Sequence, residues 1–248
     1  GEFTTAAEIA LQNGSLDGWD GSSPNAATDS KFWDTSNEGA KMGGLTPTQA
    51  VTDFVHTQGG KAAKLESGKV DLMGGIFAAA SLYTGSFGST NIWTQTATVN
   101  FGQSFTARPI ALKGFYKYTP NVINLVKNVP AGVTIVKDQT LDQCAIYIAL
   151  AKKTYTIDNG NQSTFIDFKN DENIIAYGEL PSGAATEGDG YVEFNIPLKY
   201  KNLTDQPTHI IVVCSSSKYG DYMTGGAGST LYVDDLSLIY DGTPTIWE

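Results

Sequence analysis

Gly228-Ser-Thr-Leu-Tyr-Val-Asp-Asp-Leu-Ser-Leu-Ile-Tyr240 is the stretch that decides the fold. Its apolar residues alternate with polar ones, as in a β-strand with one buried face: they stand at odd positions up to Val233 and at even positions from Leu236 onward. A regular strand cannot change parity in this way without an extra residue. The stretch therefore predicts the closing strand of a β-sandwich, with a β-bulge at Asp234 and Asp235.

The predicted bulge would direct two neighbouring carboxylates, Asp234 and Asp235, at one small region near a sheet edge. A hard cation with oxygen ligands, most plausibly calcium, would relieve the repulsion between them. In the alternative, one carboxylate faces solvent and the other accepts backbone N–H groups in a turn. The residues alone leave both interpretations open.

The rest of the chain repeats the period-two pattern in short stretches separated by Gly, Asn and Asp turns. This pattern predicts an all-β fold, a two-sheet antiparallel sandwich with little helix and with the first and last strands close together. No Pro-rich or Ser-rich linker divides the sequence, so residues 1–248 are expected to form a single domain. The expected strands are 61–67, 76–83, 94–101, 104–106, 110–118, 144–150, 191–198 and 209–214, with a turn at 87–91.

Four stretches, in this order, resemble the putative carbohydrate metabolism domain of surface lipoproteins from Bacteroides-type gut bacteria. The resemblance implies a jelly-roll sandwich like that of carbohydrate-binding modules and galactose-binding-like domains, and a role in handling glycans. It also implies an extracytoplasmic location, either periplasmic or anchored to the outer membrane. The stretches are Asn13-Gly-Ser-Leu-Asp-Gly-Trp19, Arg108-Pro-Ile-Ala-Leu-Lys-Gly-Phe-Tyr-Lys-Tyr118, Cys214-Ser-Ser-Ser-Lys-Tyr-Gly-Asp221 and the closing stretch already quoted.

The opening turn of sugar-binding jelly rolls often supplies an acidic residue to a structural calcium near the end of the chain. By this resemblance, Asp17 is the expected partner of Asp234 or Asp235 in a calcium site. A plain Asp-Gly turn at Asp17 and Gly18 is the alternative.

The net charge of −10 opposes binding to nucleic acid and to anionic membrane surfaces. Neutral glycans and cations remain natural partners, and we expect a monomer that binds an oligo- or polysaccharide. No stretch is long and apolar enough to span a bilayer. Cys144 and Cys214 both point inward by parity, which favours buried free thiols over a disulfide across the core.

Four outward-facing positions form the candidate ligand site. Parity places Lys113 and Phe115 away from the core, and it does the same for Tyr147 and Glu193 on two other strands. If these strands are neighbours, their outer faces share one surface that mixes aromatic and polar groups, as sugar-binding clefts do. In the alternative, this face packs against a loop and belongs to the core.

A further aromatic residue, Trp33, lies in a stretch rich in Gly, Ser and Asn, residues 21–44, which is expected to be a long loop. Its indole ring could stack on a sugar at the same surface as Phe115 and Tyr147. Alternatively, it folds back over the core.

The sequence carries no catalytic signature. His56 and His209 lack the spacing of metal ligands, and no nucleophile elbow or phosphate-binding loop occurs. The sequence therefore favours a non-catalytic glycan-binding module. The alternatives are a glycoside hydrolase with a pair of carboxylates, which the sequence does not single out, and a structural or adhesion component with a protein partner.

Overall fold

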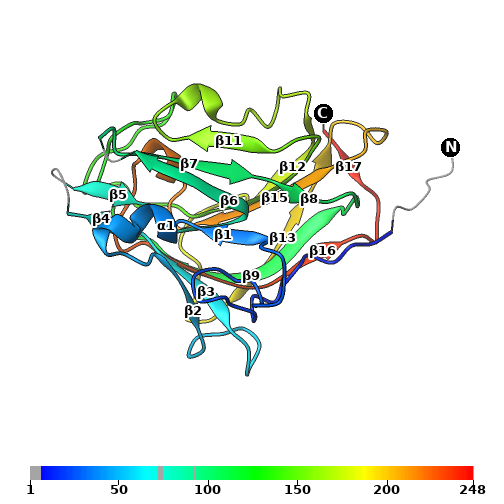
Figure 1. The fold of residues 1–248 in the computed structure, drawn as a ribbon, viewed down its shortest axis with the longest axis horizontal. Coiled ribbons are helices and arrows are strands. Elements are labelled where there is room, and N and C mark those ends of the chain that lie inside the picture. The colour runs from blue at the N-terminus through cyan, green and yellow to red at the C-terminus, as the bar shows by residue number, and fades with distance from the viewer. Residues whose placement is uncertain (1–6, 72–74, 92, 248) are drawn as a thin grey trace.

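The computed structural model describes residues 7–71, 75–91 and 93–247. Two β-sheets pack face to face, and the few helices are single turns at the periphery (Figure 1). The predicted all-β, two-sheet antiparallel jelly-roll sandwich is confirmed. One parallel pair, between β14 and β17, departs from the antiparallel pattern.

The larger sheet has ten strands. Eight of them follow one another across the sheet; β1 is added beside β6, and β8 is added beside β15. In spatial order the eight are β11 (Tyr155–Asp158), β7 (Thr96–Phe101), β6 (Ser81–Asn91), β15 (His209–Ser215), β10 (Ala145–Ala151), β12 (Ile174–Glu179), β14 (Lys199–Tyr200) and β17 (Thr245–Ile246), and the two additions are β1 (Trp33–Thr35) and β8 (Gln103–Ser104).

The smaller sheet has five strands, and a separate hairpin lies beside the sandwich. The five are, in order, β13 (Val192–Pro197), β9 (Ala111–Thr119), β16 (Thr230–Ile239), β3 (Ala62–Glu66) and β2 (Thr48–Val51); the hairpin is β4 (Gly68–Val70) with β5 (Ile76–Ala78); the helical turns are α1 (Asn37–Ala40), η1 (Lys41–Gly43), η2 (Gln162–Thr164) and η3 (Gly220–Tyr222).

The main core lies between the two sheets, and alternation along each strand builds it. Strand β10 contributes Ile146 and Ile148 from one side, and β9 contributes Leu112 and Tyr118 from the other. The intervening residues of the large sheet form a second apolar cluster on its outer face, in which Ile211 of β15 is fully buried. Strand β15 is therefore covered on both sides, which accounts for the nearly continuous apolar run of its sequence.

The predicted bulge in the closing strand is confirmed. The register between β16 and β9 shifts between Asp234 and Ser237, and Asp235 has a φ of 50°, in the left-handed region. The extra residue keeps Val233 and Leu236 both in the core. Aspartate tolerates this backbone conformation better than most residues, which explains why an acidic residue occupies the position.

The N-terminal segment lies against the same strand, but the expected closeness of the first and last strands is not found in the sheets: the first strand, β1, pairs with β6 of the ten-stranded sheet, whereas β16 belongs to the five-stranded sheet. The Leu236 N–H donates to Gly14 O at 2.7 Å, and the Tyr240 hydroxyl donates to Ile9 O at 2.6 Å. This segment forms no regular strand, because its contacts with β16 are isolated hydrogen bonds rather than a ladder.

Three local expectations are wrong. Residues 21–44 contain β1, α1 and η1 instead of one long loop. The side-chain amide of Asn25 forms hydrogen bonds with backbone groups of Phe32 and Trp33 that would otherwise lack a backbone partner. The expected strand at 76–83 is divided between β5 and β6, which belong to different sheets. The expected turn at 87–91 is the last part of the long strand β6.

Candidate functional site

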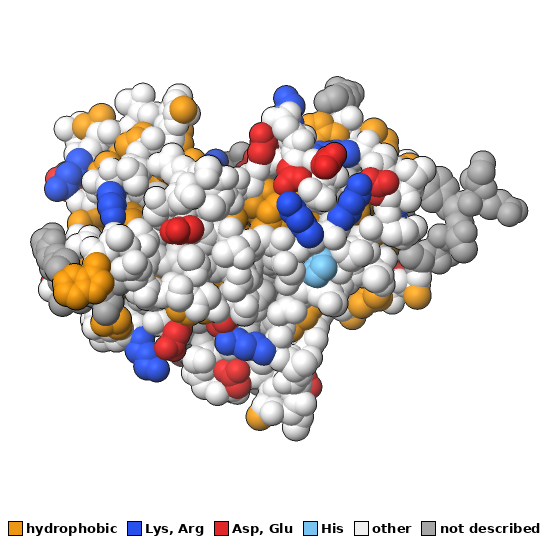
Figure 2. Space-filling model, turned by 45° about the horizontal axis from the view of Figure 1, so that its top comes forward, with side chains coloured by type: hydrophobic (Ala, Val, Ile, Leu, Met, Phe, Trp, Pro, Cys, Tyr) orange, Lys and Arg blue, Asp and Glu red, His pale blue; other side chains and the backbone are white. Residues whose placement is uncertain are grey.

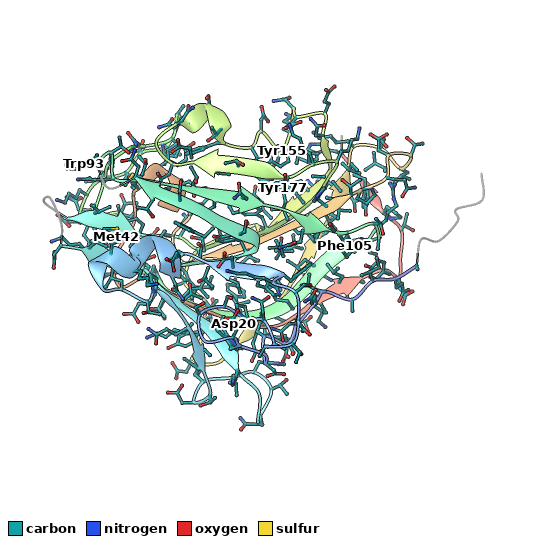
Figure 3. The ribbon with its side chains drawn as sticks, in the orientation of Figure 1. Asp20, Met42, Trp93, Phe105, Tyr155 and Tyr177 are labelled. Atoms are coloured by element: carbon teal, nitrogen blue, oxygen red, sulfur yellow. The ribbon has the colours of Figure 1, made fainter. Side chains whose placement is uncertain are left out.

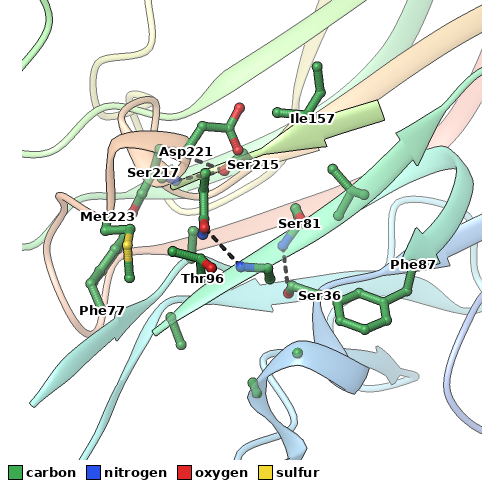
Figure 4. A pocket seen from close by; sticks show the side chains of 18 of the residues that line it. Ser36, Phe77, Ser81, Phe87, Thr96, Ile157, Ser215, Ser217, Asp221 and Met223 are labelled. Carbon is green, nitrogen blue, oxygen red and sulfur yellow. Dashed lines mark hydrogen bonds between the residues drawn. The ribbon is translucent and has the colours of Figure 1, made fainter. Parts of the chain in front are cut away.

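A cleft of about 220 Å³ opens on the outer face of the ten-stranded sheet (Figure 4). Elsewhere on this face, apolar residues of the segment between β11 and β12, including Phe165 and Phe168, pack against the sheet. Asn159 of that segment bonds Ala97 of β7 and lines the cleft, and the cleft is the part of the face that the segment leaves open. We call this space the cleft throughout.

The walls of the cleft are mainly apolar. Its floor comes from five neighbouring strands of the sheet, and its sides come from η1, from the β4–β5 hairpin and from the residues after β15. The apolar lining includes Met42, Val70, Phe77, Tyr83, Phe87, Val99, Phe101, Tyr147, Ile157, Val213 and Met223, and the polar lining includes Ser36, Ser81, Thr96, Asn159, Ser215 and Asp221.

Tyr147 is the candidate residue that the structure places in the cleft. Its ring packs edge-on against Phe168, with 5.3 Å between centroids, and it lies 6.2 Å from the ring of Tyr177. Its hydroxyl has no hydrogen-bond partner among the described residues, and burial raises its pKa well above the usual value, with Asp221 adding to the rise. The hydroxyl therefore stays protonated and is available to a ligand.

Asp221 is the carboxyl group among the described residues that line the cleft. It stands in η3 and is open to solvent, while protein surrounds it on the remaining sides. This loss of hydration raises its pKa to about 6. Figure 4 shows Asp221 on the same side of the cleft as Ser215 and Ser217, opposite Ser36 and Phe87.

An exposed tryptophan, Trp93, stands at the tip of the β6–β7 hairpin, beside the cleft (Figure 3). Its side chain is 87% exposed, although Asn91 and Gln95 on either side of it line the cleft. Met42, on the η1 side, lines the cleft and is 57% exposed. Two of the most exposed large apolar side chains among the described residues therefore stand at or next to this opening.

The expected surface shared by Phe115 and Tyr147 is not formed. Phe115 faces outward from the five-stranded sheet, and Tyr147 faces outward from the ten-stranded sheet, so the whole sandwich separates them. The prediction assumed that β9 and β10 are neighbours in one sheet. Parity along a strand gives the face but not the sheet, which is why the assumption failed.

On its own side, Phe115 is covered instead of open. The His56 ring stacks on it, with centroids 3.5 Å apart and an angle of 13° between the rings. Lys113 and Glu193 do lie beside it, as expected, but they form an ion pair with each other at 2.9 Å. This face corresponds to the alternative in which a loop, here the one between β2 and β3, packs against the strands.

Trp33 lies in the main core with no exposed surface, so it cannot stack on a sugar. Its indole N–H donates to Gln12 O at 2.8 Å, and Phe32 packs edge-on against it. The alternative in which Trp33 folds back over the core is the one the structure shows.

The three aspartates expected at a calcium site each bind hydrogen-bond donors of the protein. Asp234 accepts the backbone N–H of His56 at 2.7 Å, and Asp235 accepts the Thr57 hydroxyl and contacts the His56 ring, each at 2.6 Å. Asp17 accepts the backbone N–H of Lys61 at 2.7 Å.

Within the described ranges, no group of three or more His, Cys, Asp or Glu side chains is placed to share a metal ion. The carboxylates of Asp234 and Asp235 accept hydrogen bonds from the protein, so a calcium ion here would have to replace some of these donors. The pair fixes the loop between β2 and β3 to the bulge. Burial, together with the neighbouring charge of Asp235, raises the pKa of Asp234.

Sequence reasoning missed Trp93, which stands beside the cleft, and Asp221, which lines it. A signal was present for Trp93, because a tryptophan between two extended stretches has no strand face to join and so belongs to a hairpin tip. Asp221 stands in one of the four stretches that resemble the family, but nothing in its local pattern indicates an apolar setting.

Cys144 and Cys214 are both buried and free. None of the helices in the described part of the chain is long and apolar enough to cross a membrane. Figure 2 shows acidic and basic side chains interspersed on the face it presents.

Comparison with known proteins gives a consistent picture. The model of the family described as "Putative carbohydrate metabolism domain" matches residues 11–239. A putative glycoside hydrolase from Bacteroides vulgatus is 25% identical, with a TM-score of 0.63, over 86% of this chain and 88% of that one. A putative glycoside hydrolase from Bacteroides thetaiotaomicron is 24% identical, with a TM-score of 0.64, over 85% of this chain and 63% of that one, so this chain spans less than two thirds of its length. No curated protein sequence matches.

Proposed function

The chain belongs to the putative carbohydrate metabolism domain family, and from that premise we propose that it is a non-catalytic module that binds an oligo- or polysaccharide in the cleft. The observation that carries the proposal is the exposed Trp93 beside an opening whose walls are aromatic. The exposed ring has a free-energy cost in water, which covering it with a ligand would remove. An indole ring offers a flat apolar face to the C–H face of a pyranose.

The proposed binding mode uses the polarity of the cleft. A sugar ring would stack on Trp93 at the rim, and a neighbouring sugar would enter the cleft, where the hydroxyl of Tyr147 and the carboxylate of Asp221 offer hydrogen bonds. Sites that hold small ligands combine apolar walls with a few polar groups in this way.

Hydrolysis of the glycan is the competing function. The two-carboxylate mechanism needs carboxyl groups about 5–9.5 Å apart. Among the described residues that line the cleft, Asp221 is the one carboxyl group, so the second member is missing there. This count favours binding over hydrolysis, and an assay for released reducing ends across the same glycans tests the choice.

A binding measurement with matched variants tests the proposal. The protein is screened on a glycan array, and the best ligand is titrated by calorimetry against wild type, Trp93→Ala, Trp93→Tyr and Leu141→Ala. Leu141 is a control of similar character, because it is 58% exposed and does not line the cleft. We expect Trp93→Ala to weaken binding about tenfold, since ring stacking contributes about 0.5–1.5 kcal/mol beyond the area it buries.

The conservative variant sharpens this test. Trp93→Tyr keeps an aromatic face and should retain most of the affinity, and Leu141→Ala should not change it. Glycan binding that is unaffected by Trp93→Ala would show that the ligand lies elsewhere, and binding to no glycan would overturn the proposal.

The proposal extends to the setting of the module. It would act as a monomer in the periplasm or at the cell surface, where the protein would have access to polysaccharides. The family resemblance and the apolar cleft support this setting. Cell fractionation of the native host and light scattering of the purified protein test location and oligomeric state.

A further inference from the structure

Asp221 is an acidic side chain without a partner in an otherwise apolar cleft. Neither a hydrogen bond nor an ion pair to its carboxylate occurs among the described residues. The buried carboxylates of the chain are, in contrast, well supplied: Asp142 accepts from two serine hydroxyls and from the backbone N–H of Gly226. Asp34 accepts from Lys31 at 2.9 Å and from the backbone N–H of Phe87 at 2.7 Å.

The groups around Asp221 do not neutralise it. Lys218 also lines the cleft, but loss of hydration is the cause of the raised pKa of Asp221, with no opposing effect from a cation. The titratable groups that line this part of the cleft are Lys218, Tyr83 and Tyr147. Outside the lining, the charge of Asp34 acts on Tyr83 and that of Glu179 on Tyr147, and Asp34 is paired with Lys31.

Ser215, which lies on the same side of the cleft, does not donate to the carboxylate either. Its hydroxyl donates to Ser217 O at 2.9 Å, so its proton is already in use (Figure 4). What this hydroxyl can still offer a ligand is a lone pair. This side of the cleft therefore presents hydrogen-bond acceptors and a negative charge, which a ligand group with several hydrogen-bond donors would match.

We propose that Asp221 makes the cleft selective for glycans that carry a protonated amino group, such as the amino sugars of an N-deacetylated chain. This inference rests on the proposed function and names the substrate class for the same site. A primary ammonium offers three N–H donors and a positive charge, whereas a sugar hydroxyl offers one donor and no charge. Asp221 is exposed at the cleft, so solvent screens part of this attraction, and the aromatic faces beside it add to the preference for a cation.

The aromatic walls favour the same group. Faces of Tyr and Phe rings carry partial negative charge and attract cations within about 6 Å of the ring centroid. Tyr147 and Phe77 both line the cleft that contains Asp221. A cationic sugar would be attracted by both the carboxylate and the aromatic faces, whereas a neutral sugar lacks the charge on which both attractions depend.

The experiment compares oligosaccharides that differ at one substituent. β-1,4-linked glucan, chitin and chitosan oligomers of equal length carry a hydroxyl, an acetamido and an ammonium group at C2, and other backbones are added in amino and hydroxyl forms. Affinities are measured for wild type, Asp221→Asn and the control Asp158→Asn, whose carboxylate does not line the cleft. We expect wild type to bind the amino form about tenfold more tightly than the hydroxyl form.

The substitution decides whether Asp221 is responsible. In Asp221→Asn the affinity for the amino form should fall much more than the affinity for the hydroxyl form, so that the preference shrinks to the small part that the aromatic walls supply, and Asp158→Asn should behave as wild type. A preference that survives Asp221→Asn at full size, or an acetamido form that binds as well as the amino form, overturns the inference. If neutral glycans bind in a way that depends on Trp93 but amino forms are not preferred, this inference fails and the proposed function stands. If no glycan binds at all, both the inference and the proposed function fail.

The pH profile gives a second readout. Affinity for the amino form should fall as the pH drops through about 6, because protonation removes the charge of Asp221, and it should fall again at higher pH where the sugar ammonium loses its proton. Affinity for the hydroxyl form should change little, and in Asp221→Asn the fall near pH 6 should be absent from both profiles. Tyr83 and Tyr147 remain protonated throughout this range because burial raises the pKa of each.

Discussion

Asp221 has a cost for the folded state wherever it is ionised, because the cleft hydrates its carboxylate less well than water does. Its pKa is about 6 in the folded chain and about 4 in an unfolded one, so between these values the folded state holds a proton that the unfolded state has lost. The contribution of this group to stability therefore falls as the pH rises from about 4 to about 6, and it is constant above that range.

The prediction from this linkage is that Asp221→Asn raises the melting temperature at pH 7 and leaves it nearly unchanged at pH 4. The measurement is the difference between variant and wild type in thermal unfolding at the two pH values. Using the difference removes the effect of the other carboxyl groups. A variant that melts below wild type at pH 7 would mean that the carboxylate has a stabilising partner.

Phe115 belongs to the stability of the other face, and we predict that Phe115→Ala leaves glycan affinity unchanged. The ring carries the stacked His56 and so helps hold the loop between β2 and β3. Its removal should lower the free energy of unfolding by roughly 2 kcal/mol, less than for a fully buried Phe. Denaturant unfolding and calorimetric titration on this one variant check both halves, and a loss of affinity in the folded fraction would contradict the separation of the two faces.

At the scale of elements, the bulge in β16 anchors a loop. Asp234 is 2% exposed and accepts N–H groups of His56 and Asp235. We predict that Asp234→Ala lowers the free energy of unfolding by about 1–3 kcal/mol, because it leaves these donors without an acceptor. Amide hydrogen exchange of residues 52–61 should quicken at the same time.

Asp235→Asn is the matched control for this loop. It keeps a side-chain oxygen that can accept the Thr57 hydroxyl, and it removes the charge that faces His56. We expect a smaller change in exchange than for Asp234→Ala. Exchange as slow in Asp234→Ala as in wild type would show that other contacts hold the loop.

A structural calcium at this bulge is tested by removing metal. Because the carboxylates of Asp17, Asp234 and Asp235 already accept protein donors, we expect the melting temperature to be the same with chelator and with added calcium. A clear rise with calcium that Asp234→Ala abolishes would restore the calcium site and would require the loop to rearrange around the ion.

Across the whole molecule, the parts of the structure that could be predicted are those set by alternation along one strand. The parity break gave the bulge, and the inward parity of Cys144 and Cys214 gave their burial. Sheet membership could not be obtained in this way, because it depends on which strands pair across long sequence separations. Phe115 and Tyr147 were therefore assigned the right orientation but the wrong common surface.

For the candidate site too, residues on strands could be predicted from the sequence, whereas residues in the connections between strands could not. Tyr147 was found because it faces outward on a strand. Trp93 and Asp221 lie in connections, where no periodicity applies, and their positions at the cleft follow from the packing of the hairpin and of η3 against the sheet. Trp33 was misplaced because Asn25, eight residues earlier, draws its backbone into the core through hydrogen bonds that no pattern signals.

The two free thiols, Cys144 and Cys214, allow the unfolding of this protein to be followed by their chemical labelling. Cys144 and Cys214 are 2% and 0% exposed, and burial raises the pKa of Cys144 to about 12, so neither presents a thiolate to reagents at neutral pH. Each becomes reactive when the sheets separate. The rate at which a thiol-specific dye is taken up should therefore follow the rate of global unfolding, without any label having to be introduced into the chain.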